Sequence, residues 1–286
     1  MPAPAEPPVV SPRSLAEALT LLQGAPDMRP IAGGTDLMVQ ITGELAPPPA
    51  RVLDIWHLDE LRGIAIDDGW LTIGALTTYT ELRYSDEIRA SLPALAECAA
   101  TIGAAQIQNR GTIGGNIVNA SPAGDTLPVL LAADADIVLR SAAGERAVAA
   151  RDFWPSYRVT ARKPDELVTT IRIPLTPGRQ LRFRKVGTRR AQAISKVMLA
   201  LAWRADGGVW RDVRVAIGSV APTPIRAHET ERVLEGAAPR ETTADHAAAT
   251  IAGEIHPIDD VRSTADYRRV VTARILHRML RDAGGW

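Results

Sequence analysis

The chain has 286 residues and a formal net charge of zero, with 46% hydrophobic and 23% charged residues. This composition is that of a globular protein, long enough for two domains, and it excludes a disordered chain. A neutral chain without a long basic stripe is not expected to bind nucleic acid, and no apolar run reaches the roughly 20 residues that a membrane span needs.

The N-terminus is rich in proline, and residues 1–12 are expected to form a mobile extension. They lack the basic start and the apolar core of a signal peptide, so the expected location is the cytoplasm. A helix is predicted next, over 14–23, where apolar residues recur at helical spacing and Ser14 can serve as the N-cap.

Short strands and helices alternate from residue 29 to residue 177. A strand over 29–32 turns through Gly33 and Gly34 into a helix over 37–41, for which Thr35 is the expected cap. The remaining pattern predicts helices over 77–84, 92–101 and 127–133, and strands over 51–56, 63–66, 70–73, 137–139, 146–149 and 167–173. We therefore expect a mixed domain over 13–177.

The pattern changes after residue 177. Three strands follow one another, over 181–186, 196–203 and 210–220, and helices follow over 229–235, 244–255 and 264–280. Residues 178–286 are therefore expected to form a second, smaller domain, an antiparallel sheet with helices on one face.

Two glycine-rich bends, about eighty residues apart, are the most informative feature of the sequence. The first is Ile31-Ala32-Gly33-Gly34-Thr35-Asp36 and the second is Gly111-Thr112-Ile113-Gly114-Gly115-Asn116. Glycine permits close backbone approach, so successive amides can point at one anion, and two such bends could hold a diphosphate. Neither bend matches the dinucleotide fingerprint of a Rossmann fold or a P-loop, which argues against a nicotinamide-binding domain and an NTPase.

The bends also carry a family resemblance. Ala-Gly-Gly-Thr-Asp-Leu and the string from Thr112 to Asp125, Thr-Ile-Gly-Gly-Asn…Ser-Pro-Ala-Gly-Asp, resemble the two flavin motifs of the FAD-binding medium subunits of molybdenum hydroxylases. This family includes xanthine dehydrogenase, aerobic carbon monoxide dehydrogenase and 4-hydroxybenzoyl-CoA reductase. The resemblance extends to the closing Ala265-Asp266-Tyr267-Arg268-Arg269, and so covers nearly the whole chain.

The resemblance implies a fold and a set of cofactor contacts. The fold is α+β, a two-part FAD-binding domain of the vanillyl-alcohol oxidase (PCMH) type followed by a small C-terminal domain of antiparallel sheet and helices. The residues implied to bind FAD are Ala32, Gly33, Gly34, Thr35, Asp36, Thr112, Ile113, Gly114, Gly115, Asn116, Asp125 and Lys185. Asp125 could instead cap the helix that follows it, and Arg184 competes with Lys185 for the position near the flavin. The chain departs from the family at Gln108, where many relatives have Arg, and at Tyr79, where His is frequent.

The resemblance also implies partners. A large subunit would carry the molybdenum cofactor and a small subunit the [2Fe–2S] clusters, in a heterotrimer or a dimer of heterotrimers. FAD on this chain would pass electrons to an external acceptor. The five histidines show no metal-ligand spacing and no hydrolase nucleophile motif is present, so neither a metal site nor a catalytic residue of the chain's own is predicted. Two alternatives stay open, namely a stand-alone FAD-dependent oxidoreductase of the same fold and a scaffold subunit without FAD.

Overall fold

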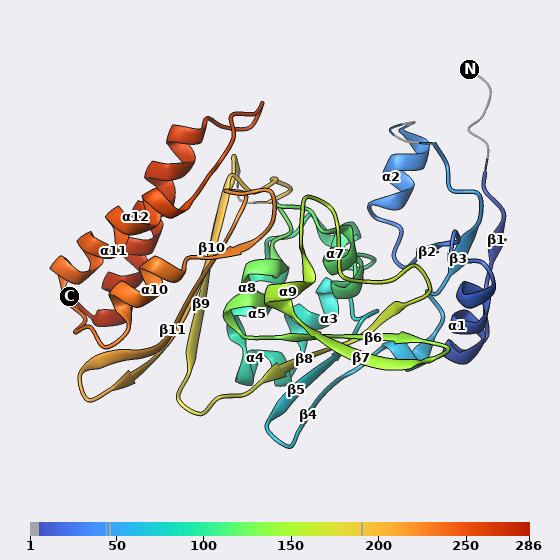
Figure 1. The fold of residues 1–286 in the computed structure, drawn as a ribbon, viewed down its shortest axis with the longest axis horizontal. Coiled ribbons are helices and arrows are strands. Elements are labelled where there is room, and N and C mark those ends of the chain that lie inside the picture. The colour runs from blue at the N-terminus through green and yellow to red at the C-terminus, as the bar shows by residue number, and fades with distance from the viewer. Residues whose placement is uncertain (1–5, 44, 46, 190) are drawn as a thin grey trace.

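The computed structural model describes residues 6–286 except 44, 46 and 190, and contains three sheets (Figure 1). Residues 1–5 of the predicted extension lie outside the described residues. Val9–Val10 form strand β1, which pairs in parallel with β3, so the first sheet begins before residue 13.

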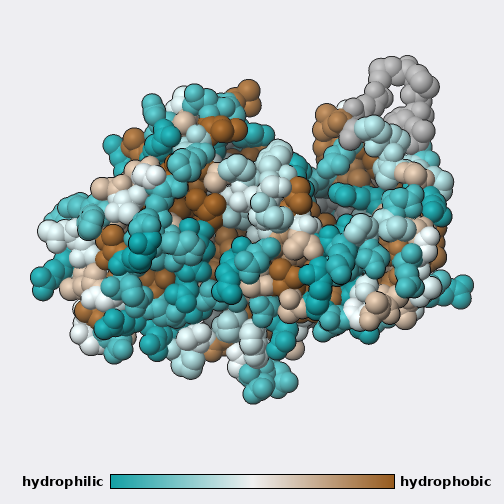
Figure 2. Space-filling view, in the orientation of Figure 1, coloured by the Kyte–Doolittle hydropathy of each residue, from teal (hydrophilic) through white to brown (hydrophobic). Residues whose placement is uncertain are grey.

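The first sheet is small and parallel, with strand order β1-β3-β2. Its further elements are α1 (Leu15–Gly24), β2 (Arg29–Ile31), α2 (Leu37–Thr42), β3 (Val52–Asp54) and the 3-10 helix η1 (Asp59–Leu61). The Ser14 hydroxyl caps α1 by accepting from the amide of Glu17, as predicted. Thr35 does not cap α2, because Asp36 occupies the N-cap position and makes no side-chain cap bond. None of the residues of α2 is buried, and Met38 and Val39 are exposed. Figure 2 shows apolar surface in the region where Figure 1 places α2.

The second sheet has five antiparallel strands in the order β4-β5-β8-β6-β7. They are β4 (Ile64–Asp67), β5 (Trp70–Gly74), β6 (Asp136–Ser141), β7 (Gly144–Ala149) and β8 (Leu167–Pro174). The helices of this part are α3 (Tyr79–Tyr84), α4 (Asp86–Ser91), α5 (Pro93–Ala100), α6 (Ala105–Gln108), α7 (Ile113–Asn119), α8 (Thr126–Ala132) and α9 (Ala150–Phe153). The strands predicted over 63–66 and 70–73 pair as the hairpin β4–β5, and those predicted over 137–139 and 146–149 pair as the hairpin β6–β7.

The third sheet is antiparallel, with strand order β12-β11-β10-β9. Its strands are β9 (Gln180–Val186), β10 (Val197–Asp206), β11 (Val209–Gly218) and β12 (Ile225–Arg226), and the helices after it are α10 (His228–Leu234), α11 (Glu241–Glu254) and α12 (Ala265–Gly284). Figure 1 shows α10–α12 on one face, as predicted, and α5 and α8 from the preceding part on the other face.

Strand β10 explains why both faces of the third sheet are covered. Side chains alternate between the faces of a strand. Leu199, Leu201 and Trp203 belong to the core beneath α10–α12, whereas Met198 and Ala200 belong to the core that contains α5 and α8. An apolar run of this kind is typical of a strand buried on both faces.

No helix in the described part of the chain is long and apolar enough to cross a bilayer.

Candidate functional site

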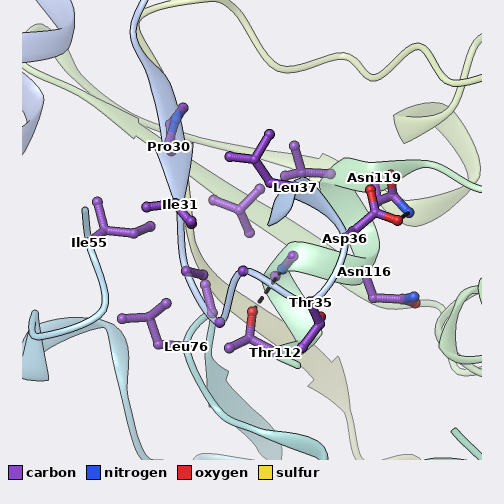
Figure 3. Close-up of a pocket in the computed structure, with 18 of the residues that line it drawn as sticks. Pro30, Ile31, Thr35, Asp36, Leu37, Ile55, Leu76, Thr112, Asn116 and Asn119 are labelled. Atoms are coloured by element: carbon purple, nitrogen blue, oxygen red, sulfur yellow. Dashed lines mark hydrogen bonds between the residues drawn. The ribbon is translucent and has the colours of Figure 1, made fainter. Parts of the chain in front are cut away.

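A cleft with a volume of about 270 Å³ lies between the first and second sheets (Figure 3). Both glycine-rich bends contribute to its wall. The predicted site residues that line it are Ala32, Gly33, Gly34, Thr35, Asp36, Thr112, Gly114, Gly115 and Asn116. The structure therefore brings together two segments that are far apart in the sequence, as the diphosphate hypothesis requires.

The first bend connects β2 to α2 and presents unpaired backbone amides. Gly34 has a φ of 74°, a left-handed conformation that glycine adopts without strain. The amides of Gly33, Gly34 and Thr35 donate to no other atom of the described residues. Because unpaired amides that line a cleft are ready donors for an anion, this bend can hold phosphate oxygens.

The second bend is the start of helix α7, and its amides have partners inside the protein. The Thr112 hydroxyl caps α7 by accepting from the amide of Gly115 at 3.1 Å. The amide of Ile113 donates to the carbonyl of Thr77 and that of Gly114 to the carbonyl of Ala75, at 3.0 and 2.9 Å. The expectation that glycine amides of both bends face the ligand is therefore wrong for Gly114 and Gly115. The second bend can offer side chains, namely those of Thr112 and Asn116.

Glycine is required in these bends because the chain packs against itself there. A Cβ atom on Gly33 would lie 1.6 Å from the carbonyl oxygen of Arg110, and one on Gly114 would lie 2.7 Å from that of Ala75. Both distances are too short for any side chain. The two glycines thus allow the bends to approach the neighbouring backbone, which sets the shape of the cleft.

The cleft wall also joins the two bends through side chains. The Asn119 amide donates to the Asp36 carboxylate at 3.3 Å, and Figure 3 shows these two residues side by side. Ile113 lies in the core beneath the wall and is fully buried. Aliphatic residues form much of the remaining surface of the cleft, namely Ile31, Leu37, Ile55, Leu76, Val118, Leu167 and Val168. The cleft can therefore take a flat apolar ring beside a charged group.

Asp125 and Lys185 form a buried ion pair beside the cleft and do not line it. Lys185 Nζ lies 2.5 Å from an Asp125 carboxylate oxygen, with the two side chains 9% and 7% exposed. The Ser195 hydroxyl donates to the other oxygen of Asp125. Burial raises the pKa of Asp125, and the charge and hydrogen bond of Lys185 oppose that shift. Lys185 also donates to the carbonyl of Thr101 at 3.1 Å, one residue before Ile102 in the cleft wall. Arg184 is exposed.

Several cleft residues were not assigned from the sequence, namely Arg29, Tyr79, Ile102, Ile107, Asn119 and Arg162. Tyr79 was noted only as a departure from the family. Its ring is buried, and burial, followed by the charges of nearby groups, raises its pKa. Gln108, the other departure, is buried and donates to the carbonyls of Ala100 and Ile102, so it fixes the backbone next to the cleft. Arg29 and Arg162 had no signal in the sequence beyond their charge.

Comparisons with known proteins identify the family of the chain. Residues 5–176 match the family described as "FAD binding domain in molybdopterin dehydrogenase", and residues 182–283 match "CO dehydrogenase flavoprotein C-terminal domain". The chain is 36% identical to the glyceraldehyde dehydrogenase medium chain of Sulfolobus acidocaldarius, covering 90% of this chain and 91% of that one. It is 30% identical to the xanthine dehydrogenase FAD-binding subunit of Escherichia coli O157:H7, covering 95% of each.

A solved structure has the same fold. Carbon monoxide dehydrogenase from Hydrogenophaga pseudoflava contains a chain that superimposes with a TM-score of 0.92 at 31% identity, covering 96% of both chains. The likeness spans both the cleft and the third sheet. The chain therefore belongs to the FAD-binding medium subunits of the molybdenum hydroxylases, and is an oxidoreductase flavoprotein subunit.

Proposed function

We propose that this chain holds one FAD by its diphosphate in the cleft and carries electrons within a molybdenum hydroxylase complex. The electrons would arrive from [2Fe–2S] clusters of a small partner subunit and leave to an external acceptor. A large partner subunit would hold the molybdenum cofactor and oxidise the substrate. The observation that supports this role best is the row of unpaired amides at Gly33, Gly34 and Thr35, set in a cleft between two sheets.

The residues of the chain have binding and positioning roles in this proposal. The first bend would donate backbone hydrogen bonds to the diphosphate, and Thr112 and Asn116 would add side-chain contacts. Lys185 would place a positive charge near the flavin, held in position by Asp125 and by the carbonyl of Thr101. FAD supplies the redox chemistry when bound, and the protein sets its orientation and electrostatic surroundings.

The bends can be tested by adding one methyl group. Gly33→Ala and Gly114→Ala each place a Cβ where the backbone of Arg110 or Ala75 lies, so both should distort the cleft. We expect the purified variants to lose most of the flavin absorbance near 450 nm. Gly253→Ala is the matched control, because a Cβ there meets nothing within 4 Å and alanine favours the helix. Full flavin content in the Gly33 and Gly114 variants would contradict the proposed cradle.

The role in a complex can be tested by purifying the native protein with its partners. We expect subunits that contain molybdenum and iron to co-purify with the chain, identified by mass and metal analysis. Turnover of small alcohols by the chain alone would favour the stand-alone oxidoreductase. A purified wild-type chain that fails to bind added FAD would favour the scaffold subunit.

A further inference from the structure

A half-buried tryptophan near the first bend contacts two arginines. Trp56 comes two residues after β3, and the centre of its ring lies 4.6 Å from the guanidinium of Arg62 and 3.8 Å from that of Arg110. The face of an aromatic ring attracts a cation, and the indole ring does so most strongly. In the described part of the chain, the hydrogen bonds of both guanidiniums go to backbone carbonyls and none goes to a carboxylate. The indole ring therefore provides the attraction that draws both cations to one place.

Arg110 connects this ring to both bends. Its carbonyl oxygen would lie 1.6 Å from a Cβ atom on Gly33, so the backbones of the two residues are in contact. Its side-chain Nε lies 3.5 Å from the carbonyl oxygen of Gly33. Thr112, the N-cap of α7, follows Arg110 by two residues. The position of Arg110 therefore sets the spacing between the first bend and the start of α7.

Arg62 connects the same ring to the second sheet. One of its terminal nitrogens donates to the carbonyl of Trp56 at 2.6 Å, and the other donates to that of Leu76 at 3.2 Å. Trp56 follows β3 of the first sheet, whereas Leu76 follows β5 of the second. Leu76 and Ile55, the residue before Trp56, both line the cleft, and Figure 3 shows them on the same side of it. Arg62 thus joins the two sheets beside the cleft.

The three side chains support the wall of the cleft from outside, because none of them lines it. They are therefore placed to position the wall and not to contact a ligand. A wall that is held in place before a ligand arrives lowers the entropic cost of binding. Because Arg110 is exposed and Trp56 is half-buried, their contact adds little to the hydrophobic core. Its loss should affect the cleft more than the stability of the whole chain.

We propose that Trp56, Arg62 and Arg110 form a clamp that holds the first bend at a fixed distance from the second sheet. The three are positioning residues for the ligand of the cleft, because the clamp keeps the unpaired amides from Gly33 to Thr35 aimed at one place. That this ligand is FAD rests on the proposed function, whereas the clamp itself is a property of the ligand-free chain.

Two measurements on the full-length chain test the clamp. The first is hydrogen exchange of the flavin-free chain over residues 29–42, which reports movement of the first bend and of α2. The second is the dissociation constant of FAD. Trp56→Leu removes the ring, and Arg110→Met removes one charge while keeping the length of the side chain. We expect both variants to exchange faster over 29–42, and the dissociation constant to rise about tenfold for Trp56→Leu and about threefold for Arg110→Met.

Three further variants separate the clamp from ordinary packing. Trp56→Phe keeps an aromatic face and should restore most of the affinity that Trp56→Leu loses. The double variant that combines Trp56→Leu with Arg110→Met should bind no more weakly than Trp56→Leu alone, because Arg110 acts through the ring. Arg172→Met is the matched control and should change neither measurement. Arg172 is an exposed arginine 4.6 Å from the centre of the Trp70 ring, and this pair lies outside the cleft.

Three results would overturn the clamp. Unchanged exchange and affinity in Trp56→Leu would show that the ring does not hold the first bend. Additive losses in the double variant would show that Arg110 acts independently of the ring. An equal loss in Arg172→Met, or faster exchange in every segment of Trp56→Leu, would show general destabilisation. A wild-type chain that binds no FAD would contradict the proposed function, and hydrogen exchange of the flavin-free chain would still decide whether the clamp exists.

Discussion

Lys185 neutralises a carboxylate that lies almost wholly inside the protein. Asp125 was expected from the sequence either to contact the nucleotide or to cap α8. The structure shows it at the N-cap position without a side-chain cap bond, paired instead with Lys185 and Ser195. These partners lie 60 and 70 residues further along the chain. Sequence reasoning works from local spacing, and so it could find Asp125 as notable but could not find the partners of its carboxylate.

Because Lys185 is paired with the buried Asp125, its contribution to the free energy of unfolding should depend on pH. Removing one partner of a buried ion pair leaves an uncompensated charge, which costs about 3–5 kcal/mol. We therefore expect Lys185→Met to lower the free energy of unfolding by that amount at pH 7, as measured by urea denaturation. In the variant, burial raises the pKa of Asp125 with no lysine to oppose it. The contribution of the protonated Asp125 carboxyl to the free energy of unfolding is then fully present below pH 3.8, the usual pKa of this group. It is lost as pH rises through the raised pKa of Asp125 in the folded protein.

The deficit of the Lys185→Met variant relative to the wild type should accordingly shrink as pH falls. Lys163→Met is the matched control, because this lysine is exposed, and its effect should be small at every pH. A deficit for Lys185→Met that stays constant or grows toward acid pH would show that the lysine does not act through the charge of Asp125.

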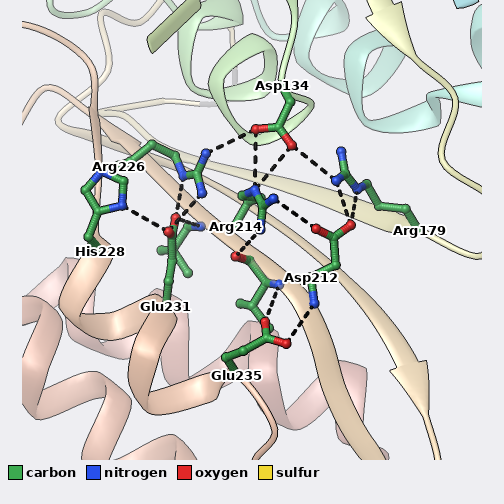
Figure 4. Close-up of polar contacts among 10 residues, drawn as sticks. Asp134, Arg179, Asp212, Arg214, Arg226, His228, Glu231 and Glu235 are labelled. Atoms are coloured by element: carbon green, nitrogen blue, oxygen red, sulfur yellow. Dashed lines mark hydrogen bonds and ion pairs between the residues drawn. The ribbon is translucent and has the colours of Figure 1, made fainter.

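Helix α8 joins the second and third sheets at both of its ends. Asp125 precedes it and pairs with Lys185 of β9, and Asp134 follows it and forms ion pairs with three arginines (Figure 4). Those arginines are Arg179, Arg214 and Arg226, at 3.1, 3.2 and 3.3 Å. All three lie C-terminal to the expected domain boundary at residue 177, so the helix is fixed to the second part of the chain by charge as well as by packing.

Asp134→Asn tests the second of these attachments. Asparagine keeps the size of the side chain and tolerates the left-handed backbone at this position, where φ is 52°. The variant removes the charge that three partly buried guanidiniums share. We expect the free energy of unfolding to fall by about 1–3 kcal/mol. This is less than the cost of breaking a fully buried ion pair, because the Asp134 side chain is 30% exposed. Asp152→Asn removes a carboxylate from an exposed surface pair and should change little. Equal effects of the two substitutions would show that Asp134 does not hold α8 in place.

The elements themselves were largely predictable, and the failures have local causes. Hairpins and the long helix α12 were found because their apolar periodicity is strong over several residues. Helix α7 was read as a bend, since its glycines are poor helix formers and only Thr112 marks its start. The cleft was predictable through its two bends, whereas Arg29 and Arg162 were not, because a single charged residue in a sequence carries no information about what it faces.

The hydrophobic core extends across the expected domain boundary at residue 177. One cluster of buried residues contains Leu127 and Leu130 of α8 together with Phe183 of β9 and Met198 of β10. A domain that folds alone has its own core, closed on all sides. Here the face of the third sheet opposite α10–α12 is covered by helices from the preceding part, so residues 13–177 and 178–286 share one core.

Shared packing of this kind should make the chain unfold as one cooperative unit. Residues 178–286 produced alone would expose Phe183, Met198 and the alanines of β10 to water, and burial of apolar surface is the main stabilising contribution to a fold. We expect this fragment to bind a hydrophobic dye and to show no cooperative urea transition, while the full chain unfolds in a single transition that is the same by far-UV circular dichroism and by tryptophan fluorescence. Two separate transitions in the full chain, or a fragment with a sharp transition of its own, would show that the third sheet is stable without α5 and α8. In that case the ion pairs at the two ends of α8 would orient an independent domain, whereas a single transition would make them part of one folding unit that includes the cleft.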